Sequence, residues 1–215
     1  MKIVTKNITV IDEILTLTNQ RAVFWVSESV LILSDIHIGK TAHFRKHGIP
    51  IPEQILQNDL HRLEELIKHF SPEKIVIVGD LFHAEHNNDV KIFKDWMTNF
   101  NSLKWILVKG NHDRLSKSLL KGFEFEIFNE YTLNPFTFIH DDNGHTIEKF
   151  TISGHIHPGV FIKGKGRQSI KLPCYQVTKN QLILPAFSLF TGLNTREIPE
   201  EAICYAFTDE GIFEA

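Results

Sequence analysis

The chain has 215 residues, of which 42% are hydrophobic, and its formal net charge is −3. This length suits one domain with a sizeable core, and the charge excludes a global attraction to nucleic acid or to an anionic membrane. No apolar run approaches the ~20 residues of a membrane span, and the first residues lack a secretory signal. The two cysteines, Cys174 and Cys204, could form one disulfide. Neither lies in a C-x-x-C pattern, and so few cysteines favour a reduced, cytoplasmic protein.

From residue 30 to about residue 110, strand and helix patterns alternate. Short, fully apolar runs predict buried strands, and apolar residues at helical spacing predict helices between them. The strands are expected at 30–33, 75–78 and 105–108, and the helices at 55–70 and 90–100. This alternation indicates parallel strands joined by helical crossovers.

After about residue 123 the pattern changes to short strands and turns. Strands are expected at 136–139, 149–153, 170–177, 181–184 and 203–207. They predict a second, mainly antiparallel sheet, packed against the first with helices outside. A Rossmann-like sheet is the alternative, but no G-x-G-x-x-G follows the first strand.

Ligand-type side chains collect where the apolar runs end. Asp35 and His37 follow the first buried strand, Asp80 follows the second, and "GNHD" (110–113) follows the third. The carboxyl ends of strands in open α/β sheets are where sites are built. The β-rich half adds His140 after one apolar run, and "SGHIHPG" (153–159) with two histidines after another.

Each of these signals has an ordinary alternative explanation when it stands alone. An Asp after a strand is more often a turn or a helix cap, and a single buried histidine is more often satisfied by a neighbour. The alternatives do not explain why all five motifs end apolar runs. Residues two apart in an extended segment point the same way, so Asp35 with His37, and His155 with His157, form two pairs. Oxygen and imidazole ligands without thiolate suit Mn²⁺, Fe²⁺ or Zn²⁺.

The order D-x-H, G-D, G-N-H-D, a single His and G-H-x-H resembles the calcineurin-like metallophosphoesterase superfamily. "SDIHIGKTAHFRKHGIPIP", "GDLFH", "SGHIHPG" and "LPAFSLFTG" are similar to bacterial ligase-associated phosphoesterases (PdeM-like), which are described as DNA-damage-response endonucleases. This closer resemblance covers roughly residues 31 to 193. It implies an α/β metallophosphoesterase fold with two packed mixed β-sheets flanked by helices (an α/β/β/α sandwich), in a single domain over residues 1–215.

The resemblance also implies a site with two divalent ions, Mn²⁺ in first place and Zn²⁺ or Fe²⁺ as alternatives. One ion would be bound by Asp35, His37, Asp80 and His157, and the other by Asp80, Asn111, His140 and His155, with Asp80 bridging the two. Two such ions activate a water for in-line attack on phosphorus. His112 would stabilise developing charge or protonate the leaving oxygen.

One position departs from the superfamily pattern. Many members carry a carboxylate three residues after the bridging Asp, where it orients the acid histidine, and this chain has His83 there. Asp113 or Glu85 would be the replacement.

Two basic stretches flank the predicted ligands and are candidates for substrate contact. Lys40 and Arg45 follow the first ligand pair, and Lys163, Lys165 and Arg167 follow the last. A solvated loop or hairpin tip is the alternative for both. Neither stretch interleaves aromatic residues as a stacking platform for single strands would.

The leading hypothesis is a metal-dependent phosphodiesterase, a nuclease acting on DNA in repair. The alternatives are a hydrolase of small nucleotides or other phosphoesters, and a metal-stabilised binding module without turnover. The resemblance implies a phosphodiester substrate such as DNA and repair ligase or helicase partners, with no membrane and a cytoplasmic location.

Overall fold

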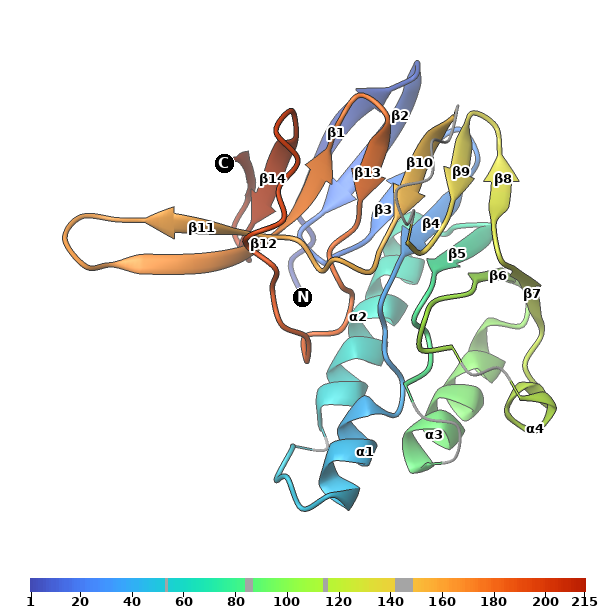
Figure 1. Cartoon of the computed structure of the whole chain (residues 1–215). Coiled ribbons are helices and arrows are strands. Elements are labelled where there is room, and N and C mark those ends of the chain that lie inside the picture. Colours follow the sequence, from blue (N-terminus) through green and yellow to red (C-terminus); the bar gives the residue numbers. More distant parts are fainter. Residues whose placement is uncertain (53, 84–86, 114–115, 142–148) are drawn as a thin grey trace.

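The computed structural model describes residues 1–52, 54–83, 87–113, 116–141 and 149–215. It contains two mixed β-sheets packed face to face, with the helices gathered on one side (Figure 1). The predicted pair of packed mixed β-sheets is therefore confirmed, but in the described residues helices cover the outer face of the first sheet alone, so the expected second helical layer of an α/β/β/α sandwich is absent there. No helix of the described residues is long and apolar enough to cross a membrane.

The first sheet has seven strands in chain order. Its members are β1 (Thr5–Val10), β2 (Glu13–Thr18), β3 (Val23–Trp25), β4 (Val30–Leu33), β5 (Lys74–Val78), β6 (Lys104–Val108) and β7 (Phe125–Phe128). The first four strands pair antiparallel, and β4 to β7 pair parallel. The parallel part confirms the predicted crossovers, whereas the sequence patterns did not predict β1 to β3.

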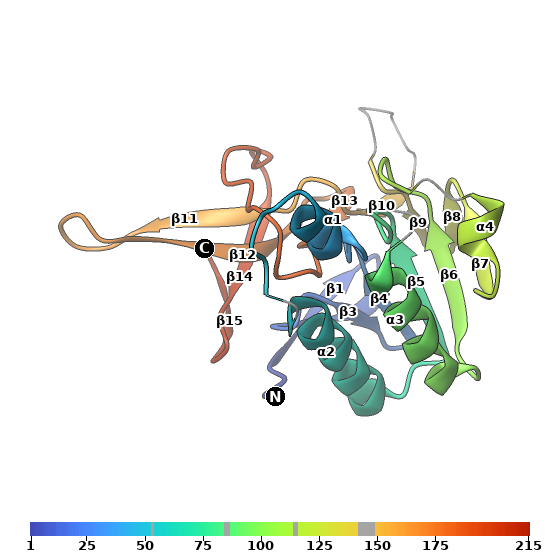
Figure 2. The same ribbon diagram turned by 90° about the horizontal axis from the view of Figure 1, so that it is seen from below.

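The helices follow the strands of this first sheet. They are α1 (Lys40–Lys46), α2 (Gln54–Phe70), α3 (Asn88–Met97), the 3₁₀ turn η1 (Thr98–Phe100) and α4 (Lys117–Leu120). Helices α2 and α3 lie against the face of the first sheet that points away from the second (Figure 2). In the part of the chain that the structure describes, no helix follows residue 120, so the second sheet has no outer helical layer there.

The second sheet has eight strands, drawn from the β-rich half of the chain. They are β8 (Tyr131–Leu133), β9 (Phe136–Phe138), β10 (Phe150–Ser153), β11 (Gly159–Lys163), β12 (Ser169–Val177), β13 (Gln181–Ile183), β14 (Ile203–Phe207) and β15 (Ile212–Glu214). Most pairs are antiparallel, as expected, but β10 lies between parallel neighbours β9 and β13. Strand β10 leads into the two histidines of "GHIH".

A core of aromatic and β-branched side chains joins the two sheets. Trp25 and Val76 of the first sheet belong to the same buried cluster as Phe136 and Tyr175 of the second. A separate cluster packs α2 and α3 on the other face of the first sheet. Because both faces of β4, β5 and β6 are covered, their carboxyl ends are held rigidly.

Candidate metal centre

The ligand-type residues meet at one edge of the first sheet. Strands β4, β5 and β6 are parallel and in register, so the segments that follow them leave the sheet side by side. Backbone pairing continues beyond the strands: Asp35 N donates to Gly79 O at 3.1 Å, and His37 N donates to Asp80 O at 2.9 Å. The predicted collection of polar side chains at this edge is therefore present.

The side chains form two groups of three, each with its ligand atoms within 4.8 Å of one another. The first group is Asp35, His37 and His157, in which His157 Nε2 lies 3.0 Å from Asp35 Oδ1. We call it the Asp35 triad.

The second group, the Asp80 triad, is Asp80, His140 and His155. His140 Nε2 lies 3.3 Å from Asp80 Oδ1, and the rings of His140 and His155 are 5.2 Å apart. The two histidines of "GHIH" thus belong to different groups, as the resemblance implied. The structure brings together six of the seven predicted ligands in these groups.

Five of these six residues have a left-handed backbone. Asp35, His37, Asp80, His155 and His157 have φ between 50° and 70°. Non-glycine residues adopt this region rarely, at a cost of roughly 1–3 kcal/mol each, and residues that do so cluster at functional sites. The left-handed turns re-aim successive side chains, so that neighbours along the chain point into the same space.

Two glycines make room for the carboxylates and imidazoles. A Cβ on Gly79 would lie 2.1 Å from His140 Nδ1, and a Cβ on Gly110 would lie 2.2 Å from Asp80 Oδ1. Gly79 also has φ 81°, whereas Gly110 is not in the left-handed region. Both positions are closed to any side chain.

The imidazole nitrogens of His37 are buried without a partner. Neither has a hydrogen-bond partner among the described residues, whereas His140 Nε2 has its charged contact with Asp80 Oδ1 at 3.3 Å. Such buried polar atoms are rare in folded proteins and call for an ion or a ligand. His140 Nδ1 lies 2.9 Å from the carbonyl oxygen of Val78, which only a protonated Nδ1 can satisfy. Because this contact fixes the Nδ1 proton, Nε2 faces Asp80 as a metal-ligand nitrogen does. The donor set therefore fits divalent ions.

The two triads differ in their protonation. Burial, helped by the positive charge of Lys40, lowers the pKa of His37 to about 3, so this imidazole is neutral at pH 7. Burial works against a charge on His140, but the contact with Asp80 and the carboxylate of Asp35 raise its pKa to about 9. A proton on His140 thus neutralises part of the negative charge of Asp80 and Asp35. A bound cation would neutralise the same charge, so the proton and the cation compete.

His112 lies beside both triads and belongs to neither. Its backbone N donates to Asp80 Oδ1 at 2.9 Å, and its exposed ring lies 5.8 Å from that of His37. Asn111 is exposed in the same turn, and its ligand role stays a prediction.

Asp113 does not take over the orientation of His112. Its two carboxylate oxygens accept hydrogen bonds from Phe82 N and Gly110 N, both at 2.8 Å, and burial raises its pKa to about 6. Glu85 lies outside the described residues. The His83 ring lies 5.4 Å from that of His112, a packing contact at the position where many family members carry a carboxylate.

The segment "LPAFSLFTG" braces the first ligand pair through its backbone. Phe187 N donates to Ser34 O at 2.8 Å, and Ser188 N donates to Asp35 O at 3.2 Å. Buried Arg62 holds this segment in turn, because its guanidinium donates to Phe187 O and lies over the Phe187 ring at 4.4 Å. The sequence patterns assigned this segment no chemistry, and its function is to fix the turn at Asp35.

Sequence reasoning also missed Asp141. Its Oδ2 lies 3.7 Å from His155 Nε2, so a carboxylate stands beside the more exposed histidine of the Asp80 triad. Its position directly after His140 was the available signal.

The predicted substrate-contact residues are placed differently from one another. Lys40, the first residue of α1, is half-buried, and its ammonium interacts with Asp35 and Asp80. Arg45 forms an ion pair with Asp89 at 3.2 Å, which ties it to the fold. Lys163, Lys165 and Arg167 are exposed on the β11–β12 hairpin.

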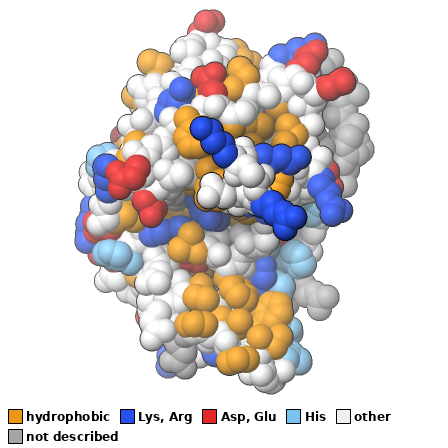
Figure 3. Space-filling model, turned by 90° about the vertical axis from the view of Figure 1, so that its left-hand side faces the viewer, with side chains coloured by type: hydrophobic (Ala, Val, Ile, Leu, Met, Phe, Trp, Pro, Cys, Tyr) orange, Lys and Arg blue, Asp and Glu red, His pale blue; other side chains and the backbone are white. Residues whose placement is uncertain are grey.

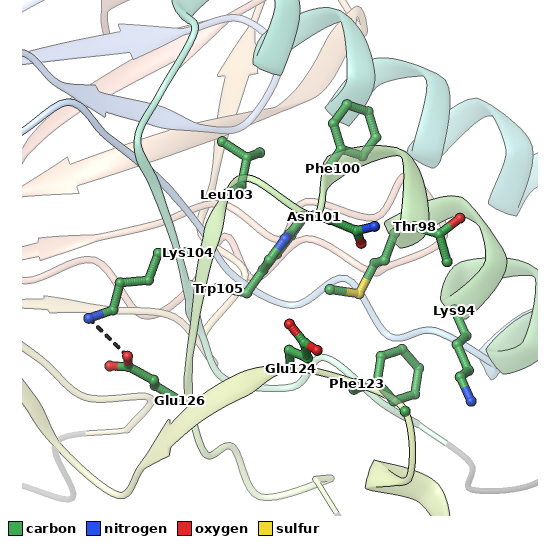
Figure 4. A pocket seen from close by; sticks show the side chains of 12 residues that line it. Lys94, Thr98, Phe100, Asn101, Leu103, Lys104, Trp105, Phe123, Glu124 and Glu126 are labelled. Atoms are coloured by element: carbon green, nitrogen blue, oxygen red, sulfur yellow. Dashed lines mark ion pairs between the residues drawn. The ribbon is translucent and has the colours of Figure 1, made fainter.

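Two cavities lie away from this edge of the sheet. One, of about 260 Å³, is found at the opposite ends of β6 and β7 and is lined by Trp105, Glu124 and the ion pair of Lys104 with Glu126 at 2.9 Å (Figure 4). None of its lining residues is a predicted ligand.

A model of the family described as "Calcineurin-like phosphoesterase" matches residues 29–187. Among solved structures, the chain is similar to the Pseudomonas putida nuclease MPE, with 26% identity and a TM-score of 0.82 over 99% of this chain and 100% of that one. It also matches Yfce, a phosphoesterase from E. coli, with 16% identity and a TM-score of 0.43 over 77% and 83% of the two chains. A curated relative, secreted RxLR effector protein 104 of Plasmopara viticola, is 36% identical over 61 residues, and the chain spans 13% of its length.

Proposed function

Because the chain belongs to the calcineurin-like phosphoesterase family, we propose that it is a metal-dependent nuclease that hydrolyses phosphodiester bonds in DNA. The observation that supports this most directly is the pair of Asp/His triads at the carboxyl edge of the first sheet. The full-length similarity to a nuclease structure supports the choice of a polynucleotide over other phosphoesters.

The ligand assignment that we propose follows the two triads. Asp35, His37 and His157 would hold one ion, and Asp80, His140 and His155 the other, with Asp80 shared and Asn111 completing the second set. Two divalent ions supply Lewis-acid activation of water and neutralise phosphoryl charge. We propose Mn²⁺ as the native ion, since oxygen and imidazole donors without thiolate suit it.

The chain's own groups then bind the phosphodiester and manage its protons. Lys40 adds a positive charge beside the carboxylates, which favours a phosphate anion at the site. His112 is exposed next to both triads, so its ring can reach a bound phosphodiester and donate a proton to the leaving oxygen. The left-handed ligand residues and the brace from Phe187 and Ser188 keep these groups in place before substrate arrives.

The test compares four substrates with and without Mn²⁺: a chromogenic phosphodiester, a chromogenic phosphomonoester, and labelled single- and double-stranded DNA. We expect Mn²⁺-dependent cleavage of the diester and of DNA. Turnover of the monoester or of the chromogenic diester without DNA cleavage would instead favour the small-phosphoester alternative. Metal binding without turnover of any substrate would favour the binding module.

A place in DNA repair beside a ligase or a helicase rests on sequence resemblance alone. Co-purification of the tagged chain with such partners from its own cells tests it.

A further inference from the structure

The β11–β12 hairpin projects from the body of the molecule directly after the Asp35 triad (Figure 1). It starts two residues after His157, whose carbonyl accepts a hydrogen bond from Asn194 N, and Gly159 N donates back to Asn194 O. Five pairs from Gly159↔Pro173 to Lys163↔Ser169 hold its two strands together. The hairpin is thus a stiff arm whose root is fixed at a proposed metal ligand.

The two faces of this arm have different chemistry. Val160, Ile162, Ile170 and Leu172 share one face, and at the root that face continues into the buried cluster around Cys174 and Cys204. Phe161, Lys163 and Lys171 share the other face, because Phe161 lies opposite Lys171 and two residues before Lys163. All three are exposed, Phe161 by 45%.

This second face corrects the expectation that the basic stretch has no interleaved aromatic residue. The interleaving is across the strands rather than along the sequence, and the cross-strand register creates it. Lys165 and Arg167 extend the charge into the tip, and residues 158–173 contain no Asp or Glu. Seen from the side on which the arm projects, Lys and Arg side chains gather over the centre of the surface (Figure 3).

We propose that the Phe161 face of the arm binds single-stranded polynucleotide next to the cleaved bond, with one base stacked on Phe161 and its flanking phosphates on Lys163 and Lys171. This inference rests on the proposed nuclease function and adds to it the form of the substrate. Single-strand sites combine a positively charged track with an aromatic ring on which a base stacks. A duplex keeps its bases stacked on one another and has none free for the ring.

The reach of the arm separates long substrates from short ones. At about 3.3 Å per residue, Phe161 lies at most about 13 Å along the chain from His157. A strand held at the triads needs flanking nucleotides to arrive there. A dinucleotide or a chromogenic diester carries no flanking phosphates for Lys163 and Lys171.

The experiment measures kcat/KM of Phe161→Ala and Phe161→Leu on an oligothymidylate of about 12 nucleotides and on a thymidine dinucleotide, after wild-type cleavage of both is established. For the long strand we expect a loss of about tenfold, within the range for one base stacked on an aromatic ring. Phe161→Trp should retain the wild-type rate. The dinucleotide and the chromogenic diester should be cleaved at wild-type rates by all variants.

Ile170→Ala is the matched control, since Ile170 is 53% exposed on the opposite face of the same arm. It should leave all substrates unaffected. Equal rates for Phe161→Ala and Ile170→Ala on the long strand would overturn the arm proposal while leaving the nuclease intact. Parallel losses on long and short substrates would also overturn it, because the arm would then act through the fold of the site. If wild-type protein cleaves the chromogenic diester but neither binds nor cleaves the long strand, the DNA function itself fails.

Discussion

Replacing Gly110 with Ala tests whether the position of Asp80 decides activity. The Gly110 backbone is not left-handed, so Ala adds no conformational strain there. The new Cβ would lie 2.2 Å from Asp80 Oδ1 and 2.3 Å from Asp80 N. The three atoms nearest to the new Cβ all belong to Asp80.

The size of the displacement follows from ordinary contact distances. A Cβ normally stays at least 3.4 Å from its neighbours, so the Asp80 carboxylate has to move by about 1.2 Å (3.4 minus 2.2). Backbone N of Asp80 is also too close, so a side-chain rotation alone does not relieve the clash. A misplacement of about 1 Å in a catalytic constellation costs roughly a hundredfold in rate. We expect a loss of about that size in kcat on a chromogenic diester, together with less than two ions per chain.

Gly192→Ala is the control, because a Cβ at Gly192 meets nothing within 4 Å. Both variants should be compared by turnover with Mn²⁺, by metal content from mass spectrometry, and by melting temperature. If Gly110→Ala has the turnover and metal content of Gly192→Ala, then Asp80 does not connect the two ions.

Four further outcomes are expected. Asp80→Ala should lower activity more than any other single ligand change. Purified active protein should hold about two divalent ions per chain, and a content of one ion per chain would refute the shared role of Asp80. His112→Gln should keep the metal content of wild type but lower kcat by about 10²–10⁴, and a parallel loss of metal would make it a ligand. The pKa of His140 is about 9 without metal, so this side chain carries a proton at pH 7.5 that must leave when the ion binds. Loading the ions should therefore release about one proton per chain, and the affinity of the chain for metal should fall about tenfold for each pH unit below 9. Calorimetry of metal binding in buffers of different ionisation heat measures the protons released. Changing Lys163, Lys165 and Arg167 together to Gln should reduce the log–log salt slope of single-strand cleavage by about 2 and leave the chromogenic diester unaffected, whereas an unchanged slope would mean that the hairpin tip is merely solvated.

The parallel strands and the ligand-type residues that follow them could be predicted because each signal is local. Fully apolar runs end at Asp35, Asp80 and the turn before His112, and the carboxyl ends of parallel strands meet by geometry. The division of "GHIH" between two groups came from the resemblance, and the structure places His157 beside Asp35 and His155 beside Asp80.

The remaining features depend on contacts between distant segments, which no local pattern reports. Strand β1 is partly exposed, β2 mixes threonine with leucine and isoleucine, and β3 has only three residues, so their patterns are weak beside the apolar runs of β4 to β6. The pairing of Phe161 with Lys171 is a cross-strand register, and the brace from Phe187 to Ser34 joins residues 153 apart in sequence. The ion pair of Arg45 with Asp89 likewise turns a predicted substrate contact into a fold contact.

If the two triads bind ions as proposed, the left-handed turns at five of the triad residues would also tie the lifetime of the polypeptide to its metal supply. These turns and the unpartnered His37 nitrogens weaken the ion-free fold, and an ion that binds only the folded chain stabilises it. An ion at a hundred times its Kd adds about 2.7 kcal/mol, or roughly 5–10 °C in Tm for a chain of this size. In a cell short of the ion, the chain would open more often and be degraded sooner, so starvation for metal would remove the protein as well as its activity. Faster proteolysis in the presence of a chelator, at a temperature where the metal-loaded chain resists the protease, is the corresponding observation.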